Sequence, residues 1–246
     1  MTIFSIKKDL TNFFTAVFYA YSKKTPLITA DCNLQLNFND VIIDVTPEAD
    51  KSERVISLIN KYDKYLINDI KTLFRSDEKD IFQTMFNYIK QLVINKKSIR
   101  EHLSNPCVII FNEKLCKVLH EVHRFTGFIR FAENEEGIFY AHYTPDNDIT
   151  ELLMPHFISR YKTMAFVIHD TSRNIFGVYN GKISKIIKSD TPITVYLSEN
   201  ECNFAELWKL YYDTVSIEER KNIKLMKNYM PVRYWKNLPE KNDIIK

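Results

Sequence analysis

Histidine, arginine and carboxylate side chains that could act in chemistry are concentrated in residues 120–173. Five of the six histidines in the chain lie in this stretch. Histidine titrates near neutral pH and can act as a general acid or base, and a carboxylate can share that role. The candidates for acid–base catalysis are His123, Glu133, His156 and Asp170. These residue types fit such chemistry but do not name a reaction.

The arginines predict a different kind of site. A planar guanidinium group binds phosphate through paired hydrogen bonds, and aromatic rings stack on unpaired bases. Cations and rings stand together at Arg233, Tyr234 and Trp235. The residues expected to bind nucleic acid are Arg124, Arg130, Arg160, Arg173, Arg220 and Arg233. Convergence of the arginines on one concave surface would indicate a phosphate or acidic ligand, whereas separate ion pairs would remove the physical basis of this prediction.

Metal and nucleotide motifs are not indicated. His120 and His123 are three positions apart, whereas the helical zinc motif H-E-x-x-H places its histidines four apart. The cysteines are widely spaced without a C-x-x-C pair, so we expect buried, reduced thiols and no zinc-ribbon or iron–sulfur site. The glycines form neither G-x-G-x-x-G nor G-x-x-x-x-G-K-[ST]. We therefore expect no metal and no cofactor.

Composition is that of an ordinary globular protein. The 246 residues are 45% hydrophobic and 26% charged. A net charge of +3 gives no global basic field, so nucleic-acid contact would depend on local charge. No apolar run approaches the roughly 20 residues that span a bilayer, and the N-terminus lacks the apolar region of a signal peptide. These features predict a cytoplasmic protein without membrane contact.

The elements that must position these residues divide the chain into two parts. Early apolar residues recur mainly at helical spacing, with short strands expected at residues 2–6 and 41–45. Asn105 and Pro106 then provide a cap and a first turn for a further helix, which we expect to end near Gly127. The expected parts are a mainly helical N-terminal lobe (1–104), an α+β core (105–240) and a loose tail (241–246). One continuous domain is the alternative.

The core alternates in hydrophobicity as strands do. Strands are expected at residues 128–132, 137–143, 164–169, 173–179, 182–187 and 194–197. Asn134–Gly137 and Asn180-Gly181 indicate hairpin turns. Pro155 is expected to break the helix between the strands and leave a short helix at 156–161. The predicted fold class is α+β, with a helical N-terminal lobe, a central antiparallel sheet with an inserted short helix, and C-terminal helices packed on the sheet.

Several motifs resemble an uncharacterised bacterial family. They are E-V-H-R-F-T-G-F-I-R-F-A-E from Glu121, P-H-F-x-x-R-Y from Pro155, I-H-D-x-x-R from Ile168 and M-P-x-R-Y-W-K-x-L-P-E from Met230. The chain is similar to the family named "probable DNA metabolism protein" over essentially its whole length, more strongly after residue 100. The resemblance implies DNA repair or modification, with a radical-SAM DNA modification or repair protein as partner. Some members are fused to a uracil-DNA glycosylase-like domain, which we do not expect here.

The expected function is therefore that of a DNA repair- or modification-associated protein that binds nucleic acid and acts with a radical-SAM partner. One alternative is an enzyme that acts on DNA or a damaged base by acid–base chemistry. Another is a protein-interaction subunit without DNA contact. The reaction, the substrate and the oligomeric state stay open, and so does whether the chain is an enzyme.

Overall fold

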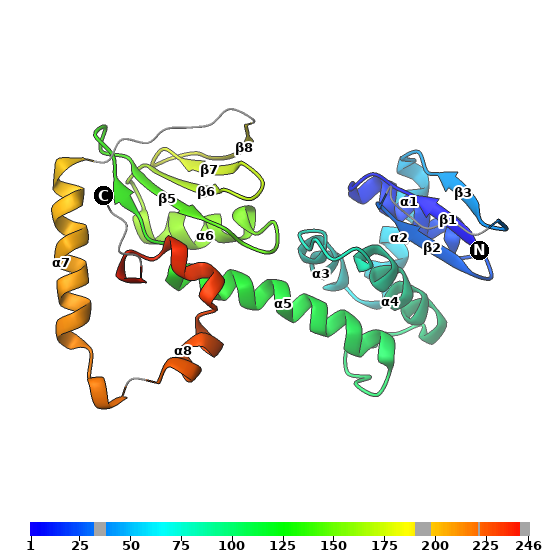
Figure 1. The fold of residues 1–246 in the computed structure, drawn as a ribbon. Coiled ribbons are helices and arrows are strands. Elements are labelled where there is room, and N and C mark those ends of the chain that lie inside the picture. The colour runs from blue at the N-terminus through cyan, green and yellow to red at the C-terminus, as the bar shows by residue number, and fades with distance from the viewer. Residues whose placement is uncertain (32–37, 190–197, 221, 242–246) are drawn as a thin grey trace. The chain divides into compact units, whose positions relative to one another are not determined.

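The chain forms two compact units, Met1–Leu119 and His120–Lys246. Their boundary falls inside the long helix α5 (Pro106–Phe128), which is drawn in green in Figure 1. The computed structural model describes residues 1–31, 38–189, 198–220 and 222–241. The predicted strand at 194–197 and almost all of the predicted tail lie outside the described residues. The α+β class is confirmed by helices and strands in both units.

The first unit contains a small parallel sheet. The sequence predicted two short strands in a mainly helical lobe but not their pairing into a sheet. Its strands lie in the order β2-β1-β3, and both pairs run parallel. They are β1 (Thr2–Ser5), β2 (Pro26–Thr29) and β3 (Val41–Asp44). The strands at 2–6 and 41–45 are confirmed, but β2 was not predicted because its four residues carry no alternating pattern.

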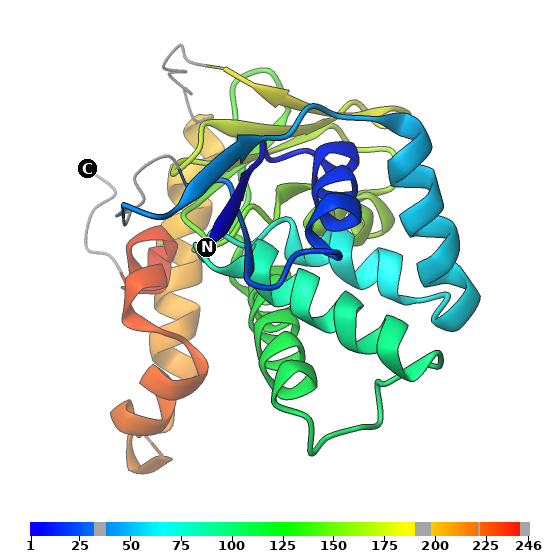
Figure 2. The same ribbon diagram turned by 90° about the vertical axis from the view of Figure 1, so that its right-hand side faces the viewer.

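Four helices accompany this sheet, and Figure 2 gives a second view of them. They are α1 (Leu10–Ala20), α2 (Ala49–Tyr62), α3 (Leu66–Leu73) and α4 (Ile81–Asn95). Their apolar faces meet in one core, in which the ring of Phe74 makes edge contacts with Phe13 at 5.5 Å and with Phe82 at 5.3 Å. Edge-to-face aromatic pairs add to the free energy gained by burying their area.

One edge of this sheet is hydrogen-bonded to a helix side chain, whereas residues at the other edge are exposed. The side-chain amide of Gln83 on α4 accepts a hydrogen bond from the backbone N–H of Ile28 at 2.9 Å and donates to the carbonyl of Pro26 at 3.3 Å. Gln83 therefore supplies hydrogen-bond partners for backbone groups on the outer edge of β2, where a further strand would otherwise pair. On the opposite edge, Val41 and Ile42 of β3 are exposed.

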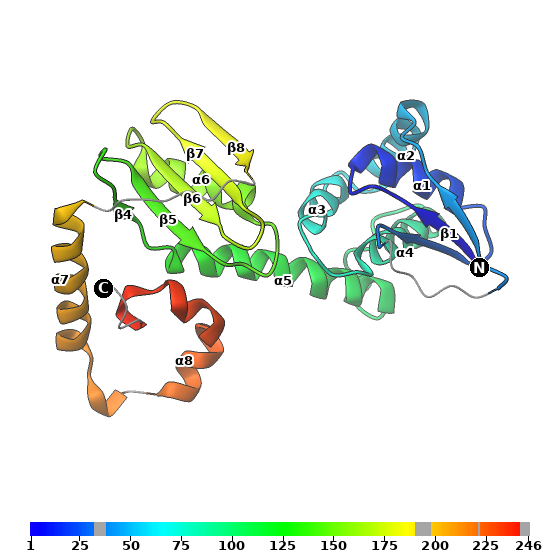
Figure 3. The same ribbon diagram turned by 45° about the horizontal axis from the view of Figure 1, so that its top comes forward.

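The second unit is built on a five-stranded sheet in the order β4-β5-β6-β7-β8. The strands are β4 (Ala132–Glu133), β5 (Phe139–Tyr143), β6 (Phe166–Asp170), β7 (Ile175–Tyr179) and β8 (Ser184–Lys188). Figure 3 shows them side by side. The sheet is mixed, which corrects the expectation of an antiparallel one: β5 and β6 run parallel, since α6 (Thr150–Tyr161) connects them as a crossover. The hairpin turns at Gly137 and Gly181 are confirmed, both with positive φ.

Two local predictions were wrong. The segment 128–131 is not a strand, and of the predicted strand only Ala132 belongs to one, β4. The last turn of α5 instead places Phe125 against the rings of Tyr143 and Tyr234 at 5.0 and 4.7 Å. The helix ends at Phe128, which confirms its predicted end near Gly127. Pro155 lies inside an unbroken helix, since the buried face of α6 continues on both sides of it with Leu153, Met154 and Phe157. Tertiary packing overrides the local signal in both cases.

The remaining elements follow the sheet. They are α7 (Glu199–Val215), η1 (Glu218–Arg220), α8 (Ile223–Tyr229), η2 (Val232–Asn237) and η3 (Pro239–Lys241). Of these elements, η2 contacts the sheet at β5, whereas α7 contacts η3. Within the described ranges, no helix combines the length and the apolar character that a membrane crossing requires.

Candidate functional site

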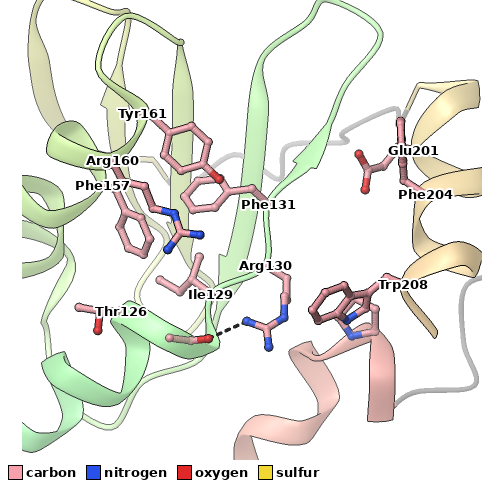
Figure 4. Close-up of a pocket in the computed structure, with 12 residues that line it drawn as sticks. Thr126, Ile129, Arg130, Phe131, Phe157, Arg160, Tyr161, Glu201, Phe204 and Trp208 are labelled. Carbon is pink, nitrogen blue, oxygen red and sulfur yellow. Dashed lines mark hydrogen bonds between the residues drawn. The ribbon is translucent and has the colours of Figure 1, made fainter. Parts of the chain in front are cut away.

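A cavity of about 490 Å³ lies in the second unit, between the end of α6, the segment that leads into β4, and the first turns of α7. Figure 4 shows the side chains that converge on it. The lining residues used below are Arg130, Phe131, Arg160, Tyr161, Glu201 and Trp208. The cavity thus combines two cations, one carboxylate and several aromatic rings.

Arg130 is held in place by the surrounding chain. Its guanidinium donates to the carbonyl of Gly127 at 2.6 Å and to Oε1 of Glu240 at 2.8 Å, and it lies 5.8 Å from the ring centre of Trp208. Burial acts to raise the pKa of Glu240, but the hydrogen bond and charge of Arg130, with Trp208, hold it below its usual value. Arg130 therefore stays charged beside an ionised carboxylate and over an aromatic ring.

Arg160 is the cation that remains available. It lies in the last turn of α6, where a positive charge suits the helix dipole, and its side chain is exposed. It forms no hydrogen bond or ion pair with any other residue that the structure describes. An anion entering the cavity would meet this guanidinium without displacing an existing partner.

Aromatic rings form much of the rest of the wall. Phe131 is packed from behind by Tyr161 at 4.7 Å and Phe157 at 5.1 Å, so its position is fixed by the core. Burial raises the pKa of Tyr161, against the charge of Arg160, so its hydroxyl is neutral at physiological pH. Trp208 on α7 is 41% exposed, and its indole N–H donates to Glu240 at 3.2 Å. A flat ligand would find ring surface on two sides.

Glu201 brings a negative charge to the same cavity. Its Oε2 accepts a hydrogen bond from the backbone N–H of Glu133 at 2.9 Å, and its own N–H donates to the hydroxyl of Ser198 at 3.2 Å. The N–H of Ser198 in turn donates to the carbonyl of Glu133 at 3.0 Å. The start of α7 is thus tied to β4, and this fixes the Glu201 carboxylate at the cavity.

A second polar cluster surrounds the loop after β5. Asp170 is fully buried and accepts hydrogen bonds from Arg173 Nη1 at 2.9 Å and from the N–H of Ser172 at 2.8 Å. Burial raises the pKa of Asp170, and Arg173 opposes that rise. Arg173 also donates to the carbonyls of Pro145 at 3.3 Å and Asp146 at 2.5 Å. This arrangement holds the loop and leaves Asp170 without access to a ligand.

Glu121 completes that cluster. Its carboxylate accepts hydrogen bonds from the N–H groups of Asp146 at 2.7 Å and Asn147 at 2.9 Å. Arg233 forms an ion pair with the Asp146 side chain at 2.6 Å and donates to the hydroxyl of Tyr234 at 3.0 Å. Glu121 and Arg233 therefore hold together α5, the loop before α6 and η2.

The predicted arginines do not converge on one surface. Arg130 and Arg160 line the cavity, but Arg130 is paired with Glu240, as Arg173 is with Asp170 and Arg233 with Asp146. Arg124 lies on α5 and Arg220 in η1, and neither lines this cavity. These separate ion pairs remove the physical basis of the prediction for Arg130, Arg173 and Arg233 as one surface. The nucleic-acid hypothesis then depends on the cavity, where Arg160 has no hydrogen-bond or ion-pair partner among the described residues.

The predicted acid–base residues are also apart. His123 on α5 and His156 on α6 are exposed, Glu133 lies on β4, and Asp170 is buried at the end of β6. No hydrogen bond or ion pair links any two of these four within the part of the chain described.

The metal prediction concerns the described residues of both units, and the two cysteines whose burial the structure gives lie in the first unit. Over the described residues, no group of three or more His, Cys, Asp or Glu side chains is placed to hold a metal ion. The expectation of buried thiols is wrong for Cys116, which is exposed, while Cys107 is partly buried. Cys32 lies outside the described residues.

Sequence reasoning missed the rings and the carboxylate of the cavity. Phe131, Tyr161 and Trp208 were not predicted as site residues, because aromatic residues within strand and helix patterns do not differ in sequence from core residues. The sequence did contain a pattern that could have identified Glu201. Ser198 and Glu201 have the S-x-x-E spacing of a capping box, which predicts a helix start and a glutamate side chain held by hydrogen bonds there.

Comparison with known proteins yields one match. The model of a family described as a domain of unknown function, DUF4130, matches residues 79–240, which is more than half of the chain. No curated protein and no solved structure matches the sequence.

Proposed function

The chain belongs to the DUF4130 family of domains of unknown function, and from its own side chains we propose that it binds single-stranded nucleic acid at the Arg130–Arg160 cavity. The observation that carries the proposal is Arg160: an exposed cation without a described partner, at the mouth of a cavity walled by aromatic rings. Cations that contact phosphate beside rings that stack on bases are the common features of single-strand binding sites.

The two arginines have different parts in this proposal. Arg160 binds the phosphate, because its guanidinium is exposed and can offer two parallel N–H groups. Arg130 supplies a fixed positive charge and keeps Trp208 in position, since both side chains are hydrogen-bonded to Glu240. Stacking of a base on the exposed face of Trp208 would contribute about 1–3 kcal/mol. A volume of about 490 Å³ lies within the range of small-ligand sites.

The same proposal includes a role in DNA repair or modification beside a radical-SAM protein. Its support is the resemblance of the motifs around Arg130, Arg160, Asp170 and Arg233 to the DNA metabolism family. Co-purification of the tagged chain with a radical-SAM protein from its own cells would test this part, and DNA binding without any such partner would contradict it.

The binding proposal is tested by fluorescence anisotropy with a labelled oligothymidylate over a series of salt concentrations. We expect the logarithm of affinity to fall linearly with the logarithm of salt, because bound phosphates release counterions. Arg160→Ala should weaken binding by about tenfold and reduce the slope by about 0.7, the value for one single-strand phosphate contact.

Lys185→Ala is the matched control. Lys185 is exposed on β8, at the opposite edge of the sheet from β4, and its loss removes the same charge. An affinity independent of salt, or an equal loss of affinity in the two variants, would overturn the proposal.

A further inference from the structure

We infer that the base bound in the cavity is guanine and that the carboxylate of Glu201 recognises it; this inference rests on the proposed single-strand binding. The cavity contains Glu201 together with Arg130 and Arg160. A carboxylate repels phosphate and has no hydrogen to donate when ionised, so it favours the part of a ligand that presents hydrogen-bond donors. Its presence indicates which part of a nucleotide lies at each side of the cavity.

The arrangement of charge gives the nucleotide a direction. Figure 4 shows Arg160 on the α6 side and Glu201 on the α7 side, with Phe131 between them. A phosphate bound by Arg160 therefore directs its base past Phe131 toward Glu201 and Trp208. The rings contact the face of the base, and its edge meets the carboxylate.

Glu201 retains hydrogen-bonding capacity in this position. Its Oε2 accepts one hydrogen bond, from the backbone N–H of Glu133, whereas an ionised carboxylate offers about four acceptor positions. The bond to Glu133 fixes the carboxylate before a ligand arrives. A pre-positioned acceptor binds its donor more tightly than a mobile one, because less conformational entropy is lost on binding.

Guanine is the base whose edge fits a lone carboxylate. It presents two adjacent donors, N1–H and the N2 amino group, which can pair with the two carboxylate oxygens. Adenine and cytosine present one amino group beside an acceptor ring nitrogen. Thymine presents N3–H between two carbonyl oxygens, and both of these would face the negative charge. Acceptors placed against a carboxylate are disfavoured, so guanine is selected.

The test compares labelled oligothymidylates whose central base is guanine, hypoxanthine, adenine or thymine. We expect the guanine oligonucleotide to bind about tenfold more tightly than the all-thymine one, the discrimination of a good bidentate contact. Hypoxanthine, which keeps N1–H but lacks the amino group, should bind with intermediate affinity.

Glu201→Gln separates recognition from folding. The glutamine carbonyl can still accept from the N–H of Glu133, so the start of α7 keeps its anchor, but the side chain no longer offers two anionic acceptors. We expect the ratio of the affinities for the guanine and the all-thymine oligonucleotides to fall from about tenfold to about one. Glu206→Gln is the matched control, since Glu206 lies on the same helix, is exposed and does not line the cavity.

The outcomes distinguish this inference from the function on which it rests. Equal affinity for the four oligonucleotides, with an Arg160-dependent salt response, would overturn guanine recognition and leave single-strand binding in place. A guanine preference that persists in Glu201→Gln would overturn the role of Glu201. Absence of any Arg160-dependent binding would overturn both proposals.

Discussion

Glu121 and Tyr234, 113 positions apart in the chain, meet in the interior of the second unit, where the tyrosine hydroxyl donates to the glutamate Oε1 at 3.0 Å. Both residues are almost completely buried, at 3% and 1% exposure. The same carboxylate accepts from the backbone of Asp146 and Asn147. One buried side chain therefore connects α5, the loop before α6 and the segment η2.

Removal of this carboxylate should destabilise the protein strongly. Glu121→Ala removes the acceptor of the Asp146 and Asn147 N–H groups and of the buried Tyr234 hydroxyl, and we expect a loss of about 3–5 kcal/mol in the free energy of unfolding. Glu121→Gln keeps one acceptor and should lose about 1–3 kcal/mol. Urea denaturation followed by circular dichroism measures both. Glu113→Gln, an exposed change on the same helix, should stay within about 0.5 kcal/mol, and equal behaviour of Glu113→Gln and Glu121→Gln would contradict the assignment.

Replacement by alanine should destabilise the protein at Gly177 and stabilise it at Gly127. A Cβ at Gly177 would lie 2.5 Å from Met154 Sδ and 2.9 Å from Ile168 Cγ1, so Gly177→Ala should cost about 1–3 kcal/mol through overpacking between β7 and α6. A Cβ at Gly127 meets nothing within 4 Å and the residue is helical, so Gly127→Ala should stabilise by about 0.5–1 kcal/mol.

Thermal unfolding of the two glycine variants checks these signs. Shortening of Met154 to alanine in the Gly177→Ala background should recover part of the loss, because the closest clash is with its sulfur. Strictly additive effects of the two changes would show that the strain lies elsewhere.

Lowering the pH should reduce the free energy of unfolding, because His169 is held neutral in the folded protein. Its Nδ1 lies 2.7 Å from the hydroxyl of Tyr140, its ring stacks on Phe176 at 4.0 Å, and burial lowers its pKa. The folded state therefore holds this histidine neutral, whereas the unfolded chain takes up a proton near pH 6.5. Stability from this group is complete above about pH 6.5 and is lost as pH falls from there toward the lower folded-state pKa.

The measurement for His169 is denaturant unfolding between pH 7.5 and pH 5.5. We expect the wild-type protein to lose on the order of 1 kcal/mol more than His169→Gln over this range. His142, whose pKa is also lowered, titrates in both proteins, so the comparison isolates His169. Parallel pH profiles for the two proteins would show that His169 does not contribute.

Gln83 should be needed at the edge of the first sheet. Gln83→Leu leaves the N–H of Ile28 and the carbonyl of Pro26 without the amide that now binds them, and we expect a loss of about 1–3 kcal/mol. Hydrogen exchange should also increase at Ile28. Gln91→Leu, a change of the same kind on the same helix, should leave the exchange at Ile28 unaltered.

Features set by neighbouring residues were predictable from the sequence. The turn at Asn180-Gly181 follows from residues that tolerate positive φ, and the helix after Asn105 follows from a cap, since the Asn105 side chain accepts the N–H of Cys107 at 2.9 Å. Features set by distant residues were not. The parallel pairing of β5 with β6 and the continuation of α6 through Pro155 depend on packing that no local pattern records.

The candidate site was predictable in part for the same reason. Arg130 and Arg160 stood out by residue type, and the cavity contains both. Arg173 and Arg233 stood out equally but lie outside the cavity, and Arg130, Arg173 and Arg233 each have a carboxylate of the protein as partner. Residue type identifies a guanidinium, whereas only the fold shows whether its partner belongs to the protein.

The hydrogen bonds of Gln83 show that the region matched by the family and the folded unit do not have the same boundary. Gln83 lies inside the region matched by the family, 79–240, but the strand that it completes lies before that region. A fragment cut at the family boundary would keep α4 and lose β1, β2 and the helices with which α4 shares a core. Any relative that keeps α4 without this sheet must cover the same helix face with other residues.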